Sequence, residues 1–164
     1  MKTYKSFLEK EVKPAKDAGS ARFHIISAPY EETVSYGGGT SRGPEAIIAA
    51  SQYLEYFMGE NEPLVSDIYT VPQIKVSAPK KKVFARIAGA VLSSLKIDAL
   101  PVLFGGEHTV SYGMAKALRE YFGAGKIGIV HFDAHADLRN SYDGKKFSHA
   151  CVMRRIHEDF KMEI

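Results

Sequence analysis

The sequence contains a single cysteine, Cys151, among 164 residues. One thiol cannot form an internal disulfide framework, and it cannot supply the several thiolates of a sulfur-rich zinc site. A lone cysteine is typical of a protein that stays in a reducing compartment. We therefore expect a cytoplasmic protein.

Long apolar segments are also absent from the sequence. Residues 1–17 carry charges throughout, so they lack the apolar core of a signal peptide. The longest apolar region, about residues 83–106, is interrupted by Arg86, Lys96, Asp98 and Pro101. This pattern indicates a helix followed by a strand rather than a membrane span. We expect no membrane partner.

Neither sign of charge dominates the sequence. Lys and Arg together number 22 and Asp and Glu 19, which gives a formal charge of +3. This excess is too small to favour nucleic acid or a membrane surface as a partner. With 45% hydrophobic and 25% charged residues, the composition is that of an ordinary globular protein. We expect residues 1–164 to form one domain with a core of its own.

The hydrophobic pattern alternates between strand-like and helix-like segments, without internal repeats. Strands are expected at residues 22–30, 64–71, 98–106 and 126–135. Helices are expected to begin at Pro44, with Ile47, Ala50, Leu54 and Phe57 on one face, and to cover residues 83–95, 110–121 and 149–160. Lys80, Lys81 and Lys82 suit the solvated start of the second of these helices. The alternation predicts an α/β fold with a parallel sheet covered by helices on both faces.

Polar residues follow the last expected strand at intervals of two. Asp133, His135 and Asp137 lie in the segment IVHFDAHADL, residues 129–138. In an extended chain, residues i, i+2 and i+4 point to the same side, so the three side chains can converge on one pocket. Two carboxylates and an imidazole suit a divalent cation, and the carboxylates favour manganese or magnesium. The imidazole shifts this preference toward manganese.

His108 follows another strong strand, in LFGGEHTVSYG. Gly105 and Gly106 allow a tight turn and a close approach of the backbone there. If the two strands are neighbours, His108 can join the same cluster, because adjacent strands lie about 4.8 Å apart. A pair of metal ions about 3.5–4 Å apart could then share one carboxylate. His131 has the same parity as Asp133 but lies deeper in the expected strand, which favours a structural or supporting role.

Each of these residues also has a simpler interpretation. An isolated Asp or His at the end of a strand is usually a cap or turn residue, and His24 and His157 have no supporting context.

Three other motif matches fail. GAGKIG precedes its strand, whereas a dinucleotide loop follows one. The segment from Asp133 has Leu138 where a calcium loop needs glycine. Ser111 lacks the setting of a nucleophile elbow.

Several segments together resemble the ureohydrolase family, which includes arginases and agmatinases. GGEHTVSYG, HFDAHADLR and SHACVMRRI carry the resemblance, and SYGGGTSRGPEAI resembles the glycine-rich loop of the agmatinase branch. The match is colinear from about residue 24 to 160. The resemblance implies a three-layer α/β/α fold and two Mn²⁺ ions, with His108, Asp133, His135 and Asp137 as metal ligands. It also matches His149 to a histidine near the substrate that moves a proton, although this histidine could merely begin a helix.

The resemblance implies hydrolysis of the guanidinium group of agmatine to urea and putrescine. Arginase or guanidinobutyrase activity remains an alternative, as does a non-catalytic metal-binding fragment.

The family's second half supplies an Asp-x-Asp segment and a glutamate that holds the guanidinium, and no Asp-x-Asp follows Asp137 here. We therefore expect an incomplete domain that corresponds to the family's N-terminal half. Such a domain exposes a sheet edge and an apolar face, so we expect a homo-oligomer with a small guanidino substrate as its only other partner.

Overall fold

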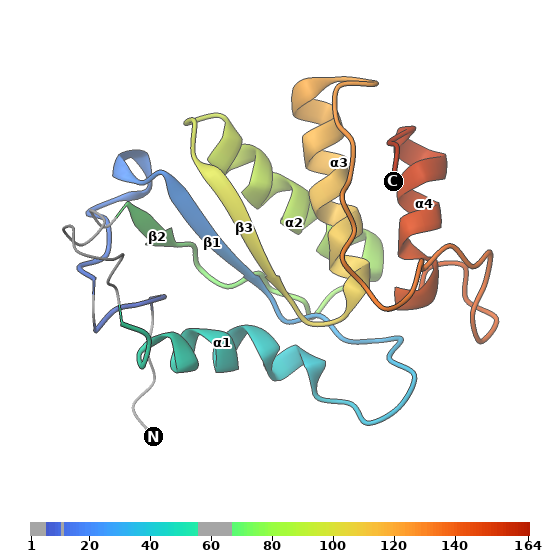
Figure 1. Ribbon diagram of the computed structural model, residues 1–164, viewed down its shortest axis with the longest axis horizontal. Helices are drawn as coiled ribbons and strands as arrows, with labels where there is room; N and C mark the ends of the chain where they lie inside the picture. The colour runs from blue at the N-terminus through green and yellow to red at the C-terminus, as the bar shows by residue number, and fades with distance from the viewer. Residues whose placement is uncertain (1–5, 11, 56–66) are drawn as a thin grey trace.

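The computed structural model describes residues 6–10, 12–55 and 67–164 (Figure 1). Its sheet is parallel and has three strands in the order β2-β1-β3, where β1 is Phe23–Ala28, β2 is Ile68–Thr70 and β3 is Leu100–Gly105. Phe23 pairs with Ile68 on one side and with Leu100 on the other. The strands expected at 22–30 and 98–106 are confirmed. The one expected at 64–71 is shorter, and its residues 64–66 lie outside the described residues.

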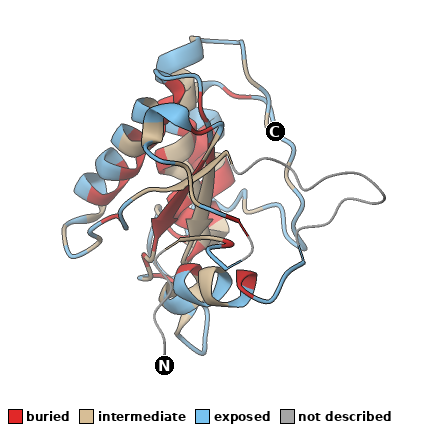
Figure 2. Ribbon diagram, turned by 90° about the vertical axis from the view of Figure 1, so that its left-hand side faces the viewer, coloured by how far each residue is buried: buried red, intermediate tan, exposed pale blue. Residues whose placement is uncertain are grey.

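Helices cover both faces of this sheet. The α-helices are α1 (Gly43–Ser51), α2 (Lys80–Leu95), α3 (Ser111–Phe122) and α4 (Val152–Phe160), and the 3₁₀ helices are η1 (Ala18–Ser20), η2 (Thr40–Arg42), η3 (His108–Val110) and η4 (His149–Cys151). The crossovers through α1 and α2 run in opposite directions along the sheet. Because such crossovers are right-handed, α1 and α2 lie on opposite faces (Figure 2). The predicted three-layer α/β/α architecture is therefore confirmed.

The first helix is shorter than the apolar spacing predicted. It ends at Ser51, so Leu54 lies beyond it and is exposed, while Phe57 falls outside the described residues. The side-chain oxygens of Ser51 and Gln52 accept hydrogen bonds from the N–H groups of Leu8 and Lys10 at 2.9 and 3.0 Å. The N-terminal segment thus occupies this end of α1. The second helix begins at Lys80, as predicted.

Two apolar clusters hold the layers together. The larger joins the sheet to α2 through Ile26 and Ala28 of β1 and through Val83, Phe84 and Ile87. The smaller lies between α3 and α4 and contains Ala115, Val152, Met153, Ile156 and Met162. It holds α4 against α3, and η4 with His149 immediately precedes α4 in the chain. No helix among the described residues is both long and apolar enough to cross a membrane.

The strand expected at 126–135 is absent, so this prediction was wrong. The segment runs alongside α3 (Figure 1) and forms only an isolated parallel bridge from Gly128 to Glu163. Its Ile127 and Ile129 pack against the α3–α4 cluster, while Val130 and Phe132 are 80% and 94% exposed. An apolar, β-favouring run becomes a strand only when a neighbouring strand supplies a hydrogen-bond ladder. Within the described chain, β3 pairs with β1 alone.

Candidate metal centre

The turn after β3 positions the first polar group of the site. The N–H groups of Gly106 and Glu107 donate to the carbonyl oxygens of Ala28 and Tyr30 at 3.0 and 2.8 Å. A side chain at position 106 would collide with the backbone carbonyl of Tyr30, so the close approach requires glycine. This close approach confirms the role that the sequence suggested for the paired glycines. It leaves His108 at the carboxyl end of the sheet, at the start of η3.

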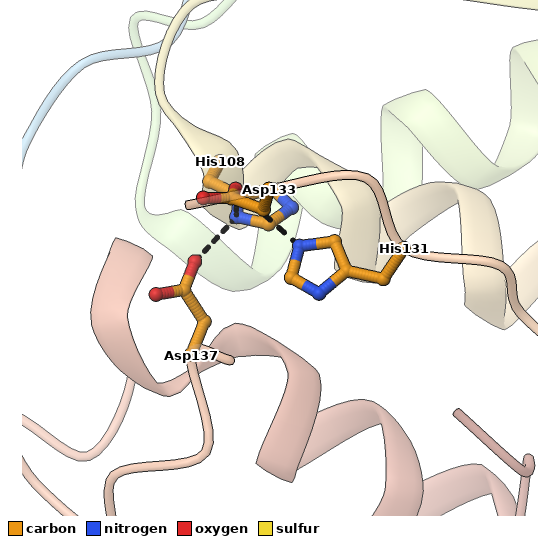
Figure 3. Close-up of side chains that lie close together, drawn as sticks. All are labelled: His108, His131, Asp133 and Asp137. Atoms are coloured by element: carbon orange, nitrogen blue, oxygen red, sulfur yellow. Dashed lines mark hydrogen bonds and ion pairs between the residues drawn. The ribbon is translucent and has the colours of Figure 1, made fainter. Parts of the chain in front are cut away.

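Four side chains converge beside this turn: His108, His131, Asp133 and Asp137 (Figure 3). Each offers one nitrogen or oxygen atom, and these atoms all lie within 4.8 Å of one another. Nδ1 of His108 lies 2.7 Å from Oδ2 of Asp137 and 3.7 Å from Oδ2 of Asp133. Side chains from the β3–α3 turn and from the 131–137 segment therefore meet, as the sequence predicted, although the second segment is not a strand.

A turn in the 131–137 segment decides which side chains enter the group. The carboxylate Oδ1 of Asp133 accepts the N–H of His135 at 3.0 Å, a local contact that bends the chain. Asp137 has a φ of 49°, in the left-handed region that aspartate tolerates better than most residues. The bend separates His135 from the group and brings Asp137 back to it.

His135 therefore lies outside the four-residue group, with a side chain that is 80% exposed. Its Nδ1 lies 3.8 Å from Oδ1 of Asp133. The other carboxylate oxygen of Asp133, Oδ2, faces His108 and His131. His131 belongs to the group, and sequence reasoning did not include it among the candidate ligands. His131 is two residues from Asp133, so in an extended chain both side chains would point to the same side, and this spacing was the signal that could have identified it. Its position inside the expected strand argued against a ligand there.

The surroundings of Asp133 favour its ionised form. The N–H group of His135 lowers the pKa of the Asp133 carboxyl most, and the neighbouring His108 and His131 lower it further. Burial acts in the opposite direction but is outweighed. Asp133 is therefore a carboxylate that can accept bonds at both oxygens.

The donor set fits a divalent cation. Nε2 of His131 is buried and has no hydrogen-bond partner, although it lies 3.3 Å from Oδ2 of Asp133. A buried polar atom without a partner is costly, and a cation in the group would give it one. Two imidazole nitrogens and two carboxylates, with their donor atoms within 4.8 Å, suit ligation at about 2.0–2.4 Å.

His149 lies at a pocket next to this group. The pocket has a volume of about 570 Å³, and its lining includes Ser35, His135, Asp137, Tyr142 and His149. Nε2 of His149 lies 3.0 Å from Oγ of Ser35, and the ring meets Tyr142 edge-on. Asp137 belongs to both the four-residue group and the pocket, so a molecule in the pocket would lie against Asp137 as well as His149.

The remaining histidines with described contacts serve the packing. His24 is buried, with Nδ1 2.8 Å from Oγ of Ser94 and Nε2 3.0 Å from the carbonyl oxygen of Ala18. Nδ1 of His157 lies 2.9 Å from the carbonyl oxygen of Met162. These contacts agree with the sequence analysis, which found no functional context for either residue.

Comparison with known proteins gives consistent matches. A model of the arginase family matches residues 21–163. The chain is 35% identical over 160 residues to an agmatinase of Pyrococcus horikoshii, covering 95% of this chain and 54% of the relative. It is 35% identical over 150 residues to an N(1)-aminopropylagmatine ureohydrolase of Thermococcus kodakarensis, covering 88% and 50%.

A solved structure shows the same likeness. The agmatine ureohydrolase of Thermoplasma volcanium superposes with a TM-score of 0.78 at 27% identity, covering 91% of this chain and 50% of that one. The chain spans about half the length of the curated relatives it matches.

Proposed function

Because the chain belongs to the arginase family, we propose that it forms part of the active site of a metal-dependent amidinohydrolase. The reaction would be hydrolysis of the guanidinium group of agmatine to urea and putrescine. The observation that carries this proposal is the four-residue group of two imidazoles and two carboxylates beside the pocket of His149. A guanidinium is stabilised by resonance, so its hydrolysis needs an activated water and a proton donor for the departing amine.

The two oxygens of Asp133 support a site for two cations. We propose that His108, Asp133 and Asp137 would hold one ion, and that Asp133 and His135 would hold a second. His131 lies on the same side as the first ion, and its unpartnered Nε2 supports that ion. Carboxylate-rich sites that include imidazole favour Mn²⁺. When bound, the ions would supply the Lewis acidity that activates water.

His149 is the proposed proton donor to the departing amine. Its Nε2 lies at the wall of the pocket that Asp137 also lines, and a histidine side chain is the group that most often transfers protons in enzymes. Proton delivery there would convert the poor leaving group of a guanidine into a neutral amine.

The names of the relatives support two candidate substrates. The Pyrococcus horikoshii relative is an agmatinase, and the Thermococcus kodakarensis relative is an N(1)-aminopropylagmatine ureohydrolase, each 35% identical to this chain. We propose agmatine as the principal substrate, because the glycine-rich loop at residues 36–43 resembles that of the agmatinase branch. Aminopropylagmatine is the second candidate, and arginine and guanidinobutyrate are comparisons for the assay.

The proposal extends to the domain organisation, the location and the assembly of the protein. Residues 1–164 would form a single α/β domain, incomplete relative to its relatives, and would act in polyamine synthesis in the cytoplasm. The exposed Val130 and Phe132 support association into a homo-oligomer, because exposed apolar side chains that lie close together often mark an interface.

A substrate comparison tests the proposed function. The chain is joined to the segment of the Pyrococcus horikoshii agmatinase that lies beyond the matched region, and urea release is measured with Mn²⁺. Agmatine should give the highest kcat/KM, followed by aminopropylagmatine, with arginine and guanidinobutyrate much lower. The relative's own full-length enzyme serves as the positive control. No urea from any substrate in a folded, manganese-loaded protein would favour a non-catalytic metal-binding role.

The same protein tests His149. Replacing His149 with Ala should slow turnover by a factor of about 10²–10⁴ while leaving the manganese content unchanged. His157→Ala is the matched control, because His157 contacts the carbonyl oxygen of Met162 and does not line this pocket. An unchanged kcat in His149→Ala would remove His149 from the proton-transfer step.

A further inference from the structure

A buried carboxylate lies behind His149, outside the proposed metal site. Glu107 is only 3% exposed, and a buried carboxylate is costly unless hydrogen bonds replace its lost water. Its oxygens accept the N–H group of Glu32 at 2.6 Å, the N–H and hydroxyl groups of Thr33, and the Thr109 hydroxyl at 2.6 Å. The family resemblance assigns no role to this residue, which lies between the glycine turn and His108.

The hydroxyl of Thr33 connects Glu107 to His149. Thr33 is buried, and its hydroxyl lies 2.8 Å from Oε1 of Glu107, where the carboxylate accepts its hydrogen. A hydroxyl has one hydrogen to donate, so toward any other group its oxygen must act as an acceptor. That oxygen accepts the backbone N–H of His149 at 3.1 Å and lies 3.5 Å from Nδ1 of the same residue.

This arrangement distinguishes the two nitrogens of the His149 ring. Facing an oxygen that can only accept, Nδ1 is favoured as the protonated nitrogen. In a neutral imidazole the other nitrogen, Nε2, then carries the free lone pair. Nε2 lies 3.0 Å from the hydroxyl of Ser35 at the pocket, and that hydroxyl can donate to it.

We propose that Glu107 and Thr33 are positioning residues that hold neutral His149 in the Nδ1–H form and direct its basic Nε2 into the pocket. The role of that nitrogen toward a substrate rests on the proposed function: its lone pair would first accept a proton, which His149 would then pass to the departing amine. The tautomer itself does not rest on the proposed function. Glu107 and Thr33 act through His149 and touch no reacting atom. A purely structural clamp between the 30–33 segment and the β3–α3 turn would also use Glu107, but it would leave the tautomer of His149 unaffected by the Thr33 hydroxyl.

Nitrogen NMR of the 164-residue chain tests the proposal. With ¹⁵N-labelled histidine, two-bond ¹H–¹⁵N correlation spectra at alkaline pH report which ring nitrogen carries the proton. The signals of His149 are assigned by their loss in His149→Gln. The wild-type chain should show mainly the Nδ1–H form. Thr33→Val, which removes the hydroxyl but keeps the branched shape, should shift the tautomer ratio toward Nε2–H about fivefold, the change expected from losing one ordinary hydrogen bond.

Thr33→Ser is the matched rescue variant, because it restores the hydroxyl and should restore the wild-type ratio. His24 and His157 provide internal references whose signals should not change. Glu107→Gln, which weakens the acceptor of the Thr33 hydroxyl hydrogen, should shift the ratio in the same direction as Thr33→Val. Circular dichroism confirms that each variant is folded, and the Thr33→Val and Thr33→Ser pair keeps the test decisive if Glu107→Gln does not fold. A wild-type ring in the Nε2–H form, or equal ratios in wild type and Thr33→Val, would overturn the proposal.

Urea assays of the joined protein separate this proposal from the proposed function. In an active protein, Thr33→Val should lower kcat about fivefold and leave KM nearly unchanged, because the hydroxyl orients His149 rather than binding the substrate. The Nδ1–H form without any urea release would contradict the proposed function and leave the positioning role supported. Urea release with an unchanged tautomer in Thr33→Val would contradict the positioning role alone.

Discussion

At the scale of single residues, Asp133 has different neighbours at its two carboxylate oxygens. Oδ2 faces Nδ1 of His108 and Nε2 of His131, whereas Oδ1 faces His135. A carboxylate with imidazole groups beside each oxygen can bind two cations. Asp137 contacts His108 and so lies on the Oδ2 side of Asp133. The variants of these residues should therefore differ in the number of ions lost, not only in affinity.

We predict three distinct manganese-binding patterns. Asp133→Ala should weaken the binding of both ions. Asp137→Asn should weaken the binding of only the tighter ion, and His135→Ala that of only the weaker ion. Each loss should be at least about tenfold in affinity, since even residues outside the ligand set commonly contribute that much. Free Mn²⁺ is measured by electron paramagnetic resonance during a titration.

His157→Ala should bind like the unmodified chain, because its imidazole contacts Met162 and not the group. His131→Ala should reduce the affinity for the tighter ion less than Asp137→Asn does, because Asp137→Asn removes a negative charge beside the cation. If Asp133→Ala and His135→Ala lost the same single ion, the carboxylate would not be shared between two cations.

The candidate site could be predicted only in part from the sequence. His108, Asp133 and Asp137 were predicted to converge, and the structure brings them together. The argument from alternating side chains assumed an extended segment, and the bond from the His135 N–H to Asp133 bends it instead. The bend separates His135 from the group and leaves His131 within it. Such a local side-chain-to-backbone contact depends on the rotamer of one aspartate, which residue spacing does not determine.

At the scale of elements, the turn after β3 depends on the absence of a side chain. A Cβ at Gly106 would meet the backbone carbonyl of Tyr30, which also accepts the Glu107 N–H that closes the turn. We predict that Gly106→Ala destabilises the fold by about 1–3 kcal/mol, the usual cost of overpacking. Gly89 in α2 is the matched control, because a Cβ there meets no atom within 4 Å.

Gly89→Ala should stabilise the protein by up to about 1 kcal/mol, because alanine favours a helix interior more than glycine does. Urea unfolding followed by circular dichroism measures both changes. Equal effects of the two substitutions would show that the 28–30 and 105–107 segments can separate without cost.

The loop before α1 is held by a carboxylate with a shifted pKa. Oε1 and Oε2 of Glu31 accept the N–H groups of Gly39 and Ser41 at 2.7 and 2.8 Å. These bonds lower the pKa of Glu31 from its ordinary value of 4.5 to about 2, with the bond from Ser41 contributing most. Because the pKa is lowered in the folded state, this stabilisation is present above about pH 4.5 and is lost as the pH falls toward 2.

We predict that the amide signals of Gly39 and Ser41 shift with a midpoint near pH 2 in an NMR titration. Glu31→Ala should abolish this transition without affecting the signals of β1. A midpoint near pH 4.5 would mean that the carboxylate does not hold the loop in solution.

The helices and the strands differed in how far the sequence predicted them. The apolar spacing of α2 and α3 predicted them well, because a helix satisfies its hydrogen bonds internally and needs only an apolar face to pack. Strand β1 has partners on both sides and was also predicted. The segment 126–135 has an equally strong apolar pattern, but its ladder partner is not encoded in the segment itself. Strand formation is decided by the neighbours, which explains this error.

At the scale of the whole molecule, the two proposed cations have unequal numbers of donors. The first ion is offered His108, Asp133 and Asp137, with His131 beside them, whereas the second is offered only His135 and the other oxygen of Asp133 among the described residues. The relatives of this chain are about twice as long as the region that it matches. The family resemblance places further acidic ligands in the second half of those relatives. The second ion should therefore bind weakly to the 164-residue chain.

This imbalance leads to the last prediction. The 164-residue chain with Mn²⁺ should release no urea from agmatine above a metal-only control, because two donors do not hold a cation firmly enough to activate water. Supplying the relative's remaining segment, covalently or by co-expression, should increase both the manganese content and urea release. The same segment with its Asp-x-Asp acids changed to alanine is the matched control and should increase neither. Manganese-dependent urea release by the 164-residue chain alone would mean that His131 completes the centre or that two copies share one.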